Sequence, residues 1–113
     1  MKLERLTLST RDLTKSRTFY STKLGFPVVE EREGVAFVVD AGGVKLHVDL
    51  TETKTPLSQT EPRLLFNTSS LALKCAMLRD RGVSVEGPRR NDTGAYAELT
   101  DPDGHSITLC ERN

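Results

Sequence analysis

The stretch DPDGHSITLCE, residues 101–111, decides how this chain is expected to fold. Pro102 holds its own φ at about −65° and Gly104 can adopt a positive φ, so the first four residues predict a β-turn. After the turn, apolar Ile107 and Leu109 alternate with polar residues, which is the pattern of a strand with one buried face. A β-hairpin is therefore expected to close the chain.

The same pattern occurs in weaker form in the first half of the chain. The residues DAGG (40–43) precede the run VKLHVDL (44–50), in which apolar and polar residues again alternate. Each half also begins with a strand-like run that is followed by a helix-like run. We therefore interpret the chain as a duplication of one structural unit.

Each half is predicted to form a βαβββ module. Asp12 is a good N-cap for the first helix, and Ser70 takes its place before the second. Leu71, Cys75 and Leu78 recur at helical spacing. The expected strands are 3–9, 26–32, 35–40, 44–50, 63–68, 95–100 and 105–111, the expected helices are 12–24 and 70–81, and a short run 83–85 precedes a loop over 87–92.

Residues 51–62 separate the two halves. They contain Thr, Ser, Gln, Glu and two prolines and have no usable hydrophobic period, so they are expected to be a linker or a mobile flap. The 113 residues have the length of a single domain. Within this domain we place the first module at about 1–50, the linker at 51–62 and the second module at about 63–113.

Composition argues against several classes of partner. Lys plus Arg equals Asp plus Glu at 16 each, so no net charge attracts nucleic acid or an anionic membrane. No run approaches the roughly 20 apolar residues that span a bilayer, and the first residues lack a secretory signal, so a cytoplasmic protein is expected. Cys75 and Cys110 lack metal-site spacing and are expected to be reduced.

The order of these elements resembles the vicinal oxygen chelate superfamily of glyoxalases, bleomycin-resistance proteins, fosfomycin-resistance transferases and extradiol dioxygenases. The residues that carry the resemblance are DL (12–13), FY (19–20), LGF (24–26) and DPDGH (101–105). It covers nearly the whole chain. It implies an α+β fold in which two βαβββ modules form an open, cupped mixed β-sheet barrel with helices on the outside and the ligand in the cup.

The metal-binding positions that the resemblance implies fall on Arg5, His47, Arg63 and Thr108. Arginine has no lone pair to offer and a neutral threonine hydroxyl is a poor ligand, so only His47 could bind a metal ion. The duplication supports this placement, because Arg63 and Thr108 hold the same places in the second half as Arg5 and His47 in the first. No metal ion and no other cofactor are expected.

Strand alternation places a second set of side chains opposite the apolar face that the helices cover. Phe37, Val39, Tyr96 and Glu98 are expected to join this face. His105 is expected to be solvated in its turn, and Tyr20 to pack at the margin of the core with its hydroxyl on a partner or water. The candidate ligand-binding residues are Arg5, Thr7, Phe37, Arg63, Asn67, Tyr96 and Thr108.

The two arginines admit two interpretations. Arg5 and Arg63 could converge as a clamp for a carboxylate or phosphate, or each could pair internally with Glu98 or Asp49. His47 could be a general base or a hydrogen-bonded residue of the cup wall, and Glu98 is the second candidate for proton transfer.

The resemblance favours a metal-independent protein that binds a small organic ligand, with an anion among the candidates, in the cupped sheet. One alternative is a lyase or isomerase in which His47 or Glu98 transfers a proton. Another is a metal-dependent enzyme similar to lactoylglutathione lyase or a dioxygenase, with its ligands at other positions. A homodimer is expected, in which the modules pair within a chain or are swapped between chains.

Overall fold

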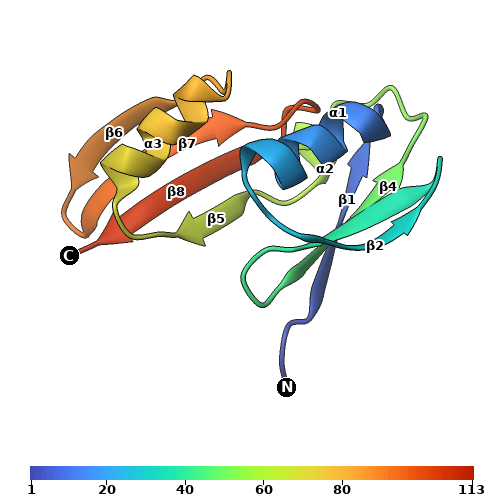
Figure 1. Ribbon diagram of the computed structural model, residues 1–113, viewed down its shortest axis with the longest axis horizontal. Helices are drawn as coiled ribbons and strands as arrows, with labels where there is room; N and C mark the ends of the chain where they lie inside the picture. The colour runs from blue at the N-terminus through green and yellow to red at the C-terminus, as the bar shows by residue number, and fades with distance from the viewer.

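Two four-stranded sheets, one from each half of the chain, lie side by side, and each carries helical segments on one face (Figure 1). The computed structural model describes residues 1–113 apart from the side chain of Ser58. The first sheet has the order β1-β4-β3-β2 and the second the order β5-β8-β7-β6. In each, the first strand pairs parallel with the last, and the other pairs are antiparallel. The α+β class and the two βαβββ modules are therefore confirmed.

The elements follow one another as the sequence predicted, with two differences at the linker and at β6. Among the described residues no strand pairing joins the two sheets, and none of the helices is long and apolar enough to cross a membrane. In chain order the elements are β1 (Arg5–Thr10), α1 (Leu13–Arg17), the π-helical η1 (Thr18–Lys23), β2 (Val28–Arg32), β3 (Ala36–Asp40), β4 (Lys45–Leu50), α2 (Leu57–Thr60), β5 (Leu64–Asn67), α3 (Leu71–Asp80), β6 (Glu86–Asn91), β7 (Gly94–Thr100) and β8 (Ser106–Arg112).

Alternation along the strands buries one face of each sheet under its helix. In β1, Leu8 is fully buried whereas Thr7 is exposed, and in β8 both Ile107 and Leu109 are buried. Helix α1 contacts β3 and β4, and α3 contacts β6, β7 and β8. We call the opposite face of each sheet, which α1 and α3 do not cover, the helix-free face.

The structure corrects the predicted placement of Phe37 and Val39. Both belong to the core cluster on the helix side, because Phe37 lies opposite Val48 and Val39 opposite Leu46 in the β3–β4 register. Val38, which lies opposite His47 in this register, faces the helix-free side. The run AFVV is apolar throughout, so its period cannot show which residues face the helix, and only the pairing with β4 decides.

The two helices are capped in different ways. The side chain of Asp12 accepts a hydrogen bond from the backbone N–H of Lys15 at 3.0 Å, as predicted. Ser70 occupies the N-cap position of α3 but has a φ of 54° and makes no side-chain cap. The carboxylate of Glu111 in β8 accepts instead from the N–H groups of Ser70 (2.8 Å) and Leu71 (3.1 Å). The predicted cap by Ser70 is therefore replaced by one from the far end of the chain.

Strand β6 covers residues that the sequence predicted as a loop. It pairs antiparallel with β7 and forms the outer edge of the second sheet, with an irregularity in register between Glu86 and Arg89. Pro88 lacks a backbone N–H, which an edge strand tolerates because one side of it has no partner to pair with. The linker was predicted to lack regular structure, but it contains the single helical turn α2.

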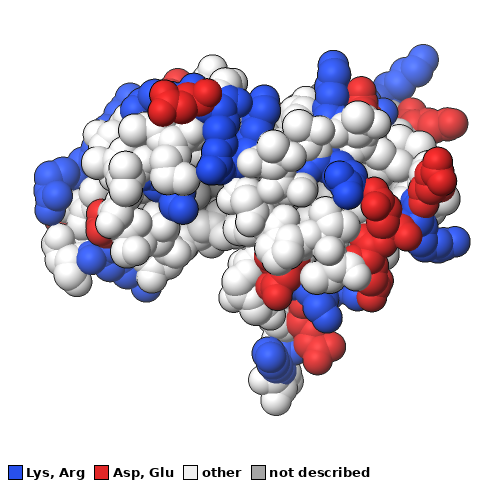
Figure 2. All heavy atoms as spheres, viewed as in Figure 1, with Lys and Arg blue, Asp and Glu red and all other residues white. Residues whose placement is uncertain are grey.

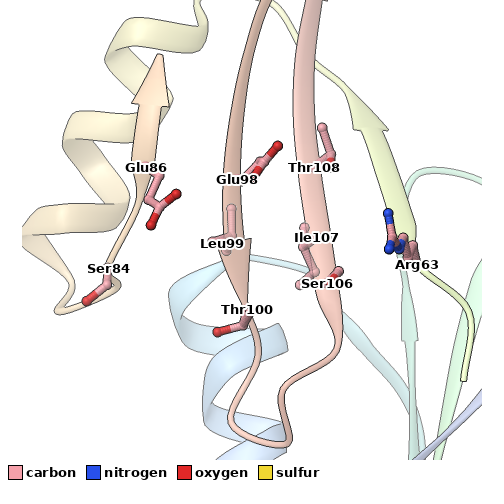
Figure 3. Close-up of a pocket in the computed structure, with 9 residues that line it drawn as sticks. All are labelled: Arg63, Ser84, Glu86, Glu98, Leu99, Thr100, Ser106, Ile107 and Thr108. Carbon is pink, nitrogen blue, oxygen red and sulfur yellow. The ribbon is translucent and has the colours of Figure 1, made fainter. Parts of the chain in front are cut away.

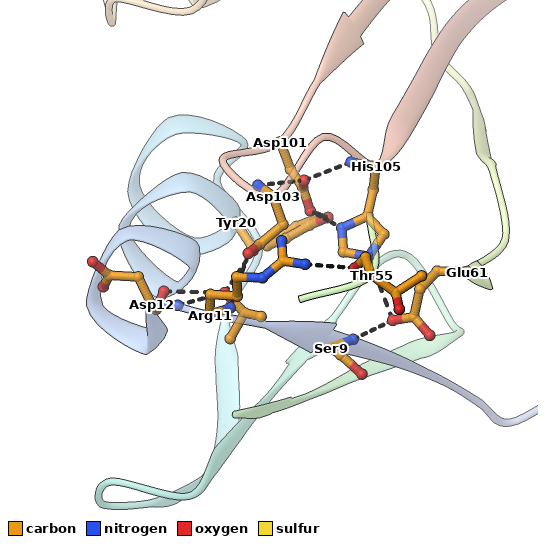
Figure 4. A network of polar contacts seen from close by, with 10 residues as sticks. Ser9, Arg11, Asp12, Tyr20, Thr55, Glu61, Asp101, Asp103 and His105 are labelled. Atoms are coloured by element: carbon orange, nitrogen blue, oxygen red, sulfur yellow. Dashed lines mark hydrogen bonds and ion pairs between the residues drawn. The ribbon is translucent and has the colours of Figure 1, made fainter. Parts of the chain in front are cut away.

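A buried polar cluster joins the two modules (Figure 4). One carboxylate oxygen of Asp101 accepts from the hydroxyl of Tyr20 and lies 2.6 Å from His105 Nδ1. The other accepts from the backbone N–H groups of Asp103 (3.0 Å) and His105 (2.9 Å). The predicted solvation of His105 is wrong, since only 1% of this residue is exposed. Tyr20 was expected at the margin of the core but is fully buried, and its hydroxyl has a protein partner in Asp101.

Further contacts extend this cluster to the first module and the linker. Asp103 accepts from the hydroxyl of Thr10 (2.5 Å) and from the backbone N–H of Arg11 (2.9 Å). Glu61 accepts from the backbone N–H of Ser9 and lies 3.4 Å from His105 Nε2. The turn at residues 101–105 thus holds both modules and the linker together.

The charge state of the cluster follows from these contacts. Burial alone would lower the pKa of His105, but hydrogen bonds and charges from Asp101 and Glu61 outweigh it and raise the pKa above its usual value. Burial and the neighbouring Asp101 carboxylate raise the pKa of Tyr20, which keeps its hydroxyl protonated. Atoms of Asp101, Asp103 and His105 that could bind a metal ion lie within 4.8 Å of one another. The carboxylate oxygens among them, however, already accept hydrogen bonds. We therefore assign the cluster a structural role.

Candidate functional site

A hollow of about 450 Å³ lies over the helix-free face of the second sheet (Figure 3). Its floor comes from neighbouring strands, because Glu98 pairs with Thr108 and Thr100 with Ser106 in the β7–β8 register. All four side chains share one face, as the alternation predicts. The polar residues that line the hollow are Arg63, Ser84, Glu86, Glu98, Thr100, Ser106 and Thr108.

Two glutamates dominate the charge of this hollow. Glu86 in β6 lies directly opposite Glu98 in β7, and Figure 3 shows both extending into the same space with Arg63 on the other side. Among the described side chains, no basic group lies within 4 Å of either carboxylate. Like charges directly opposite one another destabilise a sheet. The pair is therefore suited to accept hydrogen bonds from a ligand that carries donors or positive charge.

The helix-free face of the first sheet is already paired internally. Arg5 donates from Nη1 to Nδ1 of His47 at 3.1 Å, and Nε2 of His47 lies 2.7 Å from a carboxylate oxygen of Asp49. A neutral imidazole with its proton on Nε2 satisfies both contacts. Both ring nitrogens of His47 are thus engaged, so the ring offers no open lone pair to a metal ion or a substrate proton.

The structure separates the two arginines that the sequence suggested as a clamp. Arg5 lies on the first sheet, where its second partner is Glu30 at 3.8 Å, and not Glu98 or Asp49. Arg63 lies just before β5 and lines the hollow on the second sheet. The two guanidinium groups do not converge within one chain. The Arg5–Glu30 pair is largely exposed, so its contribution to stability is small.

The remaining predicted residues fall into three places. Glu98 and Thr108 line the hollow, and Tyr96 shares their face of β7. Thr7 is exposed on the helix-free face of the first sheet, beside His47. Phe37 is in the core, so its predicted position on the face that lines the ligand site is wrong.

Asn67 lies at the end of β5 and lines a separate groove between the modules. Sequence reasoning missed Glu86, because Pro88 made this part of the chain look like a loop. Its only signal was an acidic residue directly after the apolar run VSV (83–85).

Comparison with known proteins gives one family and a set of similar structures. The family model described as Glyoxalase/Bleomycin resistance protein/Dioxygenase superfamily matches residues 2–109. TnmS3, an antibiotic binding protein from Streptomyces sp. CB03234, has 27% identity and a TM-score of 0.80, over 100% of this chain and 97% of that chain. A glyoxalase/bleomycin resistance protein from the same strain has 28% identity and a TM-score of 0.71, over 96% and 98%.

Integron cassette protein VCH_CASS1, from the mobile metagenome of V. cholerae, has 25% identity and a TM-score of 0.79, over 100% of this chain and 96% of that chain. No curated protein sequence matches the chain. Each similarity thus covers nearly the full length of this chain and of the similar chain, so it includes both modules.

Proposed function

The chain belongs to the glyoxalase/bleomycin resistance protein/dioxygenase superfamily, and from this premise we propose that it binds a small organic molecule over the helix-free face of the second sheet without using a metal ion. The observation that carries the proposal is the hollow of about 450 Å³ with its carboxylates and hydroxyls. This volume lies within the range of small-molecule pockets. The similarity to TnmS3, an antibiotic binding protein, supports binding as the activity.

The metal chemistry of the superfamily does not fit the residues present. Arg5 and Arg63 carry permanent positive charge, and Thr108 offers only a neutral hydroxyl. His47 is held between Arg5 and Asp49 through both ring nitrogens. These four residues therefore do not suit a metal ion, and the proposed binding uses none.

The paired glutamates determine the class of ligand that we propose. Glu86 and Glu98 outnumber Arg63, so the hollow favours a molecule with an amine or several hydrogen-bond donors over an anionic ligand. A flat ring system with such donors would lie against the open floor of the hollow, which strands β7 and β8 form. The second candidate function is proton transfer by Glu98, because its carboxylate lies in the hollow whereas His47 is engaged elsewhere.

Loss of either glutamate charge is expected to weaken ligand binding about tenfold to a hundredfold. A hydrogen bond to a charged group contributes about 1.5–3 kcal/mol, and Glu98→Gln or Glu86→Gln removes that charge while keeping the shape. The measurement is calorimetric titration of the protein and both variants with aromatic amines and with aromatic carboxylates of equal size. Glu33→Gln, at the turn between β2 and β3, is the matched control.

The proposal fails if amines bind to Glu98→Gln and to the unmodified protein equally well, if carboxylates bind in this hollow as well as amines do, or if Glu33→Gln weakens binding as much as Glu98→Gln. Retention of one equivalent of a divalent ion after dialysis against a chelator would contradict the metal-independent mode. Turnover of an amine ligand that is lost in Glu98→Gln would favour the proton-transfer alternative.

We further propose that the hollow is completed by a second copy of the chain. Within one chain it is walled by residues of the second module alone, and Leu65 on the same face of β5 is 60% exposed. Sedimentation at micromolar concentration is expected to show twice the 12.5 kDa mass of the chain. Leu65→Glu is expected to shift the protein toward monomer, whereas Leu73→Glu, at a similarly exposed site on α3, is not. A mass of 12.5 kDa for the unmodified protein would rule this assembly out.

A further inference from the structure

A groove of about 210 Å³ runs along the junction of the two modules on the helix side, away from the hollow described above. Its wall combines Leu24 and Phe26 from the first module with Phe66 and Leu78 from the second. The rings of Phe26 and Phe66 lie 5.3 Å apart between centroids at an angle of 37°. Neither phenylalanine is fully buried, so an apolar surface remains open between the modules.

Positive charge borders this apolar surface. Lys74 lines the groove, and Leu78 and Arg81 follow it on the same face of α3 at helical spacing. Nη1 of Arg81 donates to the backbone carbonyl of Lys23 at 2.7 Å, which places the end of α3 beside the end of η1. Lys23 in turn precedes Leu24 in the wall.

These cations take part in no ion pair among the described side chains. Among the described side chains, no carboxylate lies within 4 Å of the charged nitrogens of Lys23, Lys74 or Arg81. Figure 2 shows basic side chains gathered at the upper part of the boundary between the two halves, with uncharged atoms below them. The junction therefore offers an apolar slot with unneutralised positive charge on its rim.

We propose that this groove is a second binding site, which takes a small amphipathic anion such as an aromatic carboxylate. The apolar body would lie against Phe26 and Phe66, and the carboxylate would meet Lys74 at the rim. The volume is below the usual range for drug-sized ligands, so it suits a molecule of one or two rings. Charge discriminates this groove from the hollow on the second sheet, where two glutamates line the wall.

A ligand in this groove contacts both modules at once. Leu24 and Phe26 belong to the segment that connects η1 to β2 in the first module, whereas Phe66 belongs to β5 in the second. Because such a ligand binds only when the two modules are docked as in this structure, it would stabilise their arrangement by mass action.

Titration with 1-naphthoate, followed by backbone amide NMR, tests the proposal. Shifts are expected at residues 24–26, 66–68 and 74–78, and Lys74→Glu is expected to lower the affinity at least tenfold. Lys54→Glu, in the exposed linker, changes the net charge equally and is expected to leave the affinity unchanged. 1-Naphthylmethylamine, which has the same ring system and opposite charge, is expected to bind this groove at least tenfold more weakly.

Several results would overturn the assignment. Shifts confined to residues 98–108 would place the naphthoate in the hollow, and equal binding of the amine would remove the role of the cations. An unchanged affinity in Lys74→Glu, with a native amide spectrum, would also refute it. If the groove amides change on dilution of the free protein and not on addition of naphthoate, a second copy covers the groove and the proposal is wrong.

Discussion

Asp101→Ala is expected to lower the free energy of unfolding by about 3–5 kcal/mol, because it removes the central charge of a buried hydrogen-bonded cluster. The substitution leaves the hydroxyl of Tyr20 and Nδ1 of His105 without their acceptor in a site closed to solvent. Two backbone N–H groups, of Asp103 and His105, lose their partner as well. Buried donors without acceptors carry the full penalty of desolvation.

Urea denaturation of the protein and of Asp101→Ala measures the difference. Asp80→Ala, at an exposed position near the end of α3, is the matched control and is expected to change stability by less than about 0.5 kcal/mol. Tyr20→Phe, which removes one donor and keeps the ring, is expected to cost about 1 kcal/mol. A loss below 1 kcal/mol in Asp101→Ala would show that the cluster does not hold the modules together.

The same experiment has a pH readout. The raised pKa of His105 means that its protonated form stabilises the folded state. This contribution is fully present below the unfolded pKa of about 6.5 and is lost as the pH rises through the higher folded value. The contacts with Asp101 are the first of the causes that raise the pKa of His105. The free energy of unfolding of Asp101→Ala is therefore expected to depend less on pH above about 6.5 than that of the unmodified protein.

Gly94→Ala is expected to destabilise the fold by roughly 3 kcal/mol or more. Gly94 begins β7 at a φ of 147°, and a Cβ built there would lie 2.1 Å from the backbone carbonyl oxygen of Glu111. That oxygen belongs to β8, so relief requires the two central strands of the second sheet to separate. The sheet that carries the hollow would be distorted with them.

Gly34→Ala is the control for backbone strain alone. Gly34 also has a positive φ, of 72°, but a Cβ there would meet no atom within 4 Å. The expected loss is about 1–2 kcal/mol, the strain of placing alanine in a left-handed conformation. Thermal unfolding of both variants separates strain from the clash, and equal losses would contradict the predicted close approach of β7 and β8.

Local sequence patterns predicted most of the fold. The turn at 101–104, the cap at Asp12 and the alternation in β1, β4 and β8 each depend on residues close together in the chain, and the structure confirms all of them. Duplication then allowed the second module to be predicted from the first. Of the candidate residues, Glu98 and Thr108 lie on the predicted face of the second sheet, because strand alternation decides this. Arg63, just before β5, lines the same hollow.

By itself, then, the sequence determined most of the strands and helices, their order, and which side of most strands is apolar, but it missed α2 and β6. Register and long-range contacts decided the rest. Which side of the sheet Phe37 faces depended on the pairing of β3 with β4. The ion-pair partner of Arg5 depended on where β2, which carries Glu30, lies in the sheet. The burial of His105 depended on Glu61 and Tyr20, which come from distant segments of the chain. The hydrophobic period reports only on neighbours within one chain segment. Burial and charge pairing are set by side chains that meet only when distant strands pair and the modules dock.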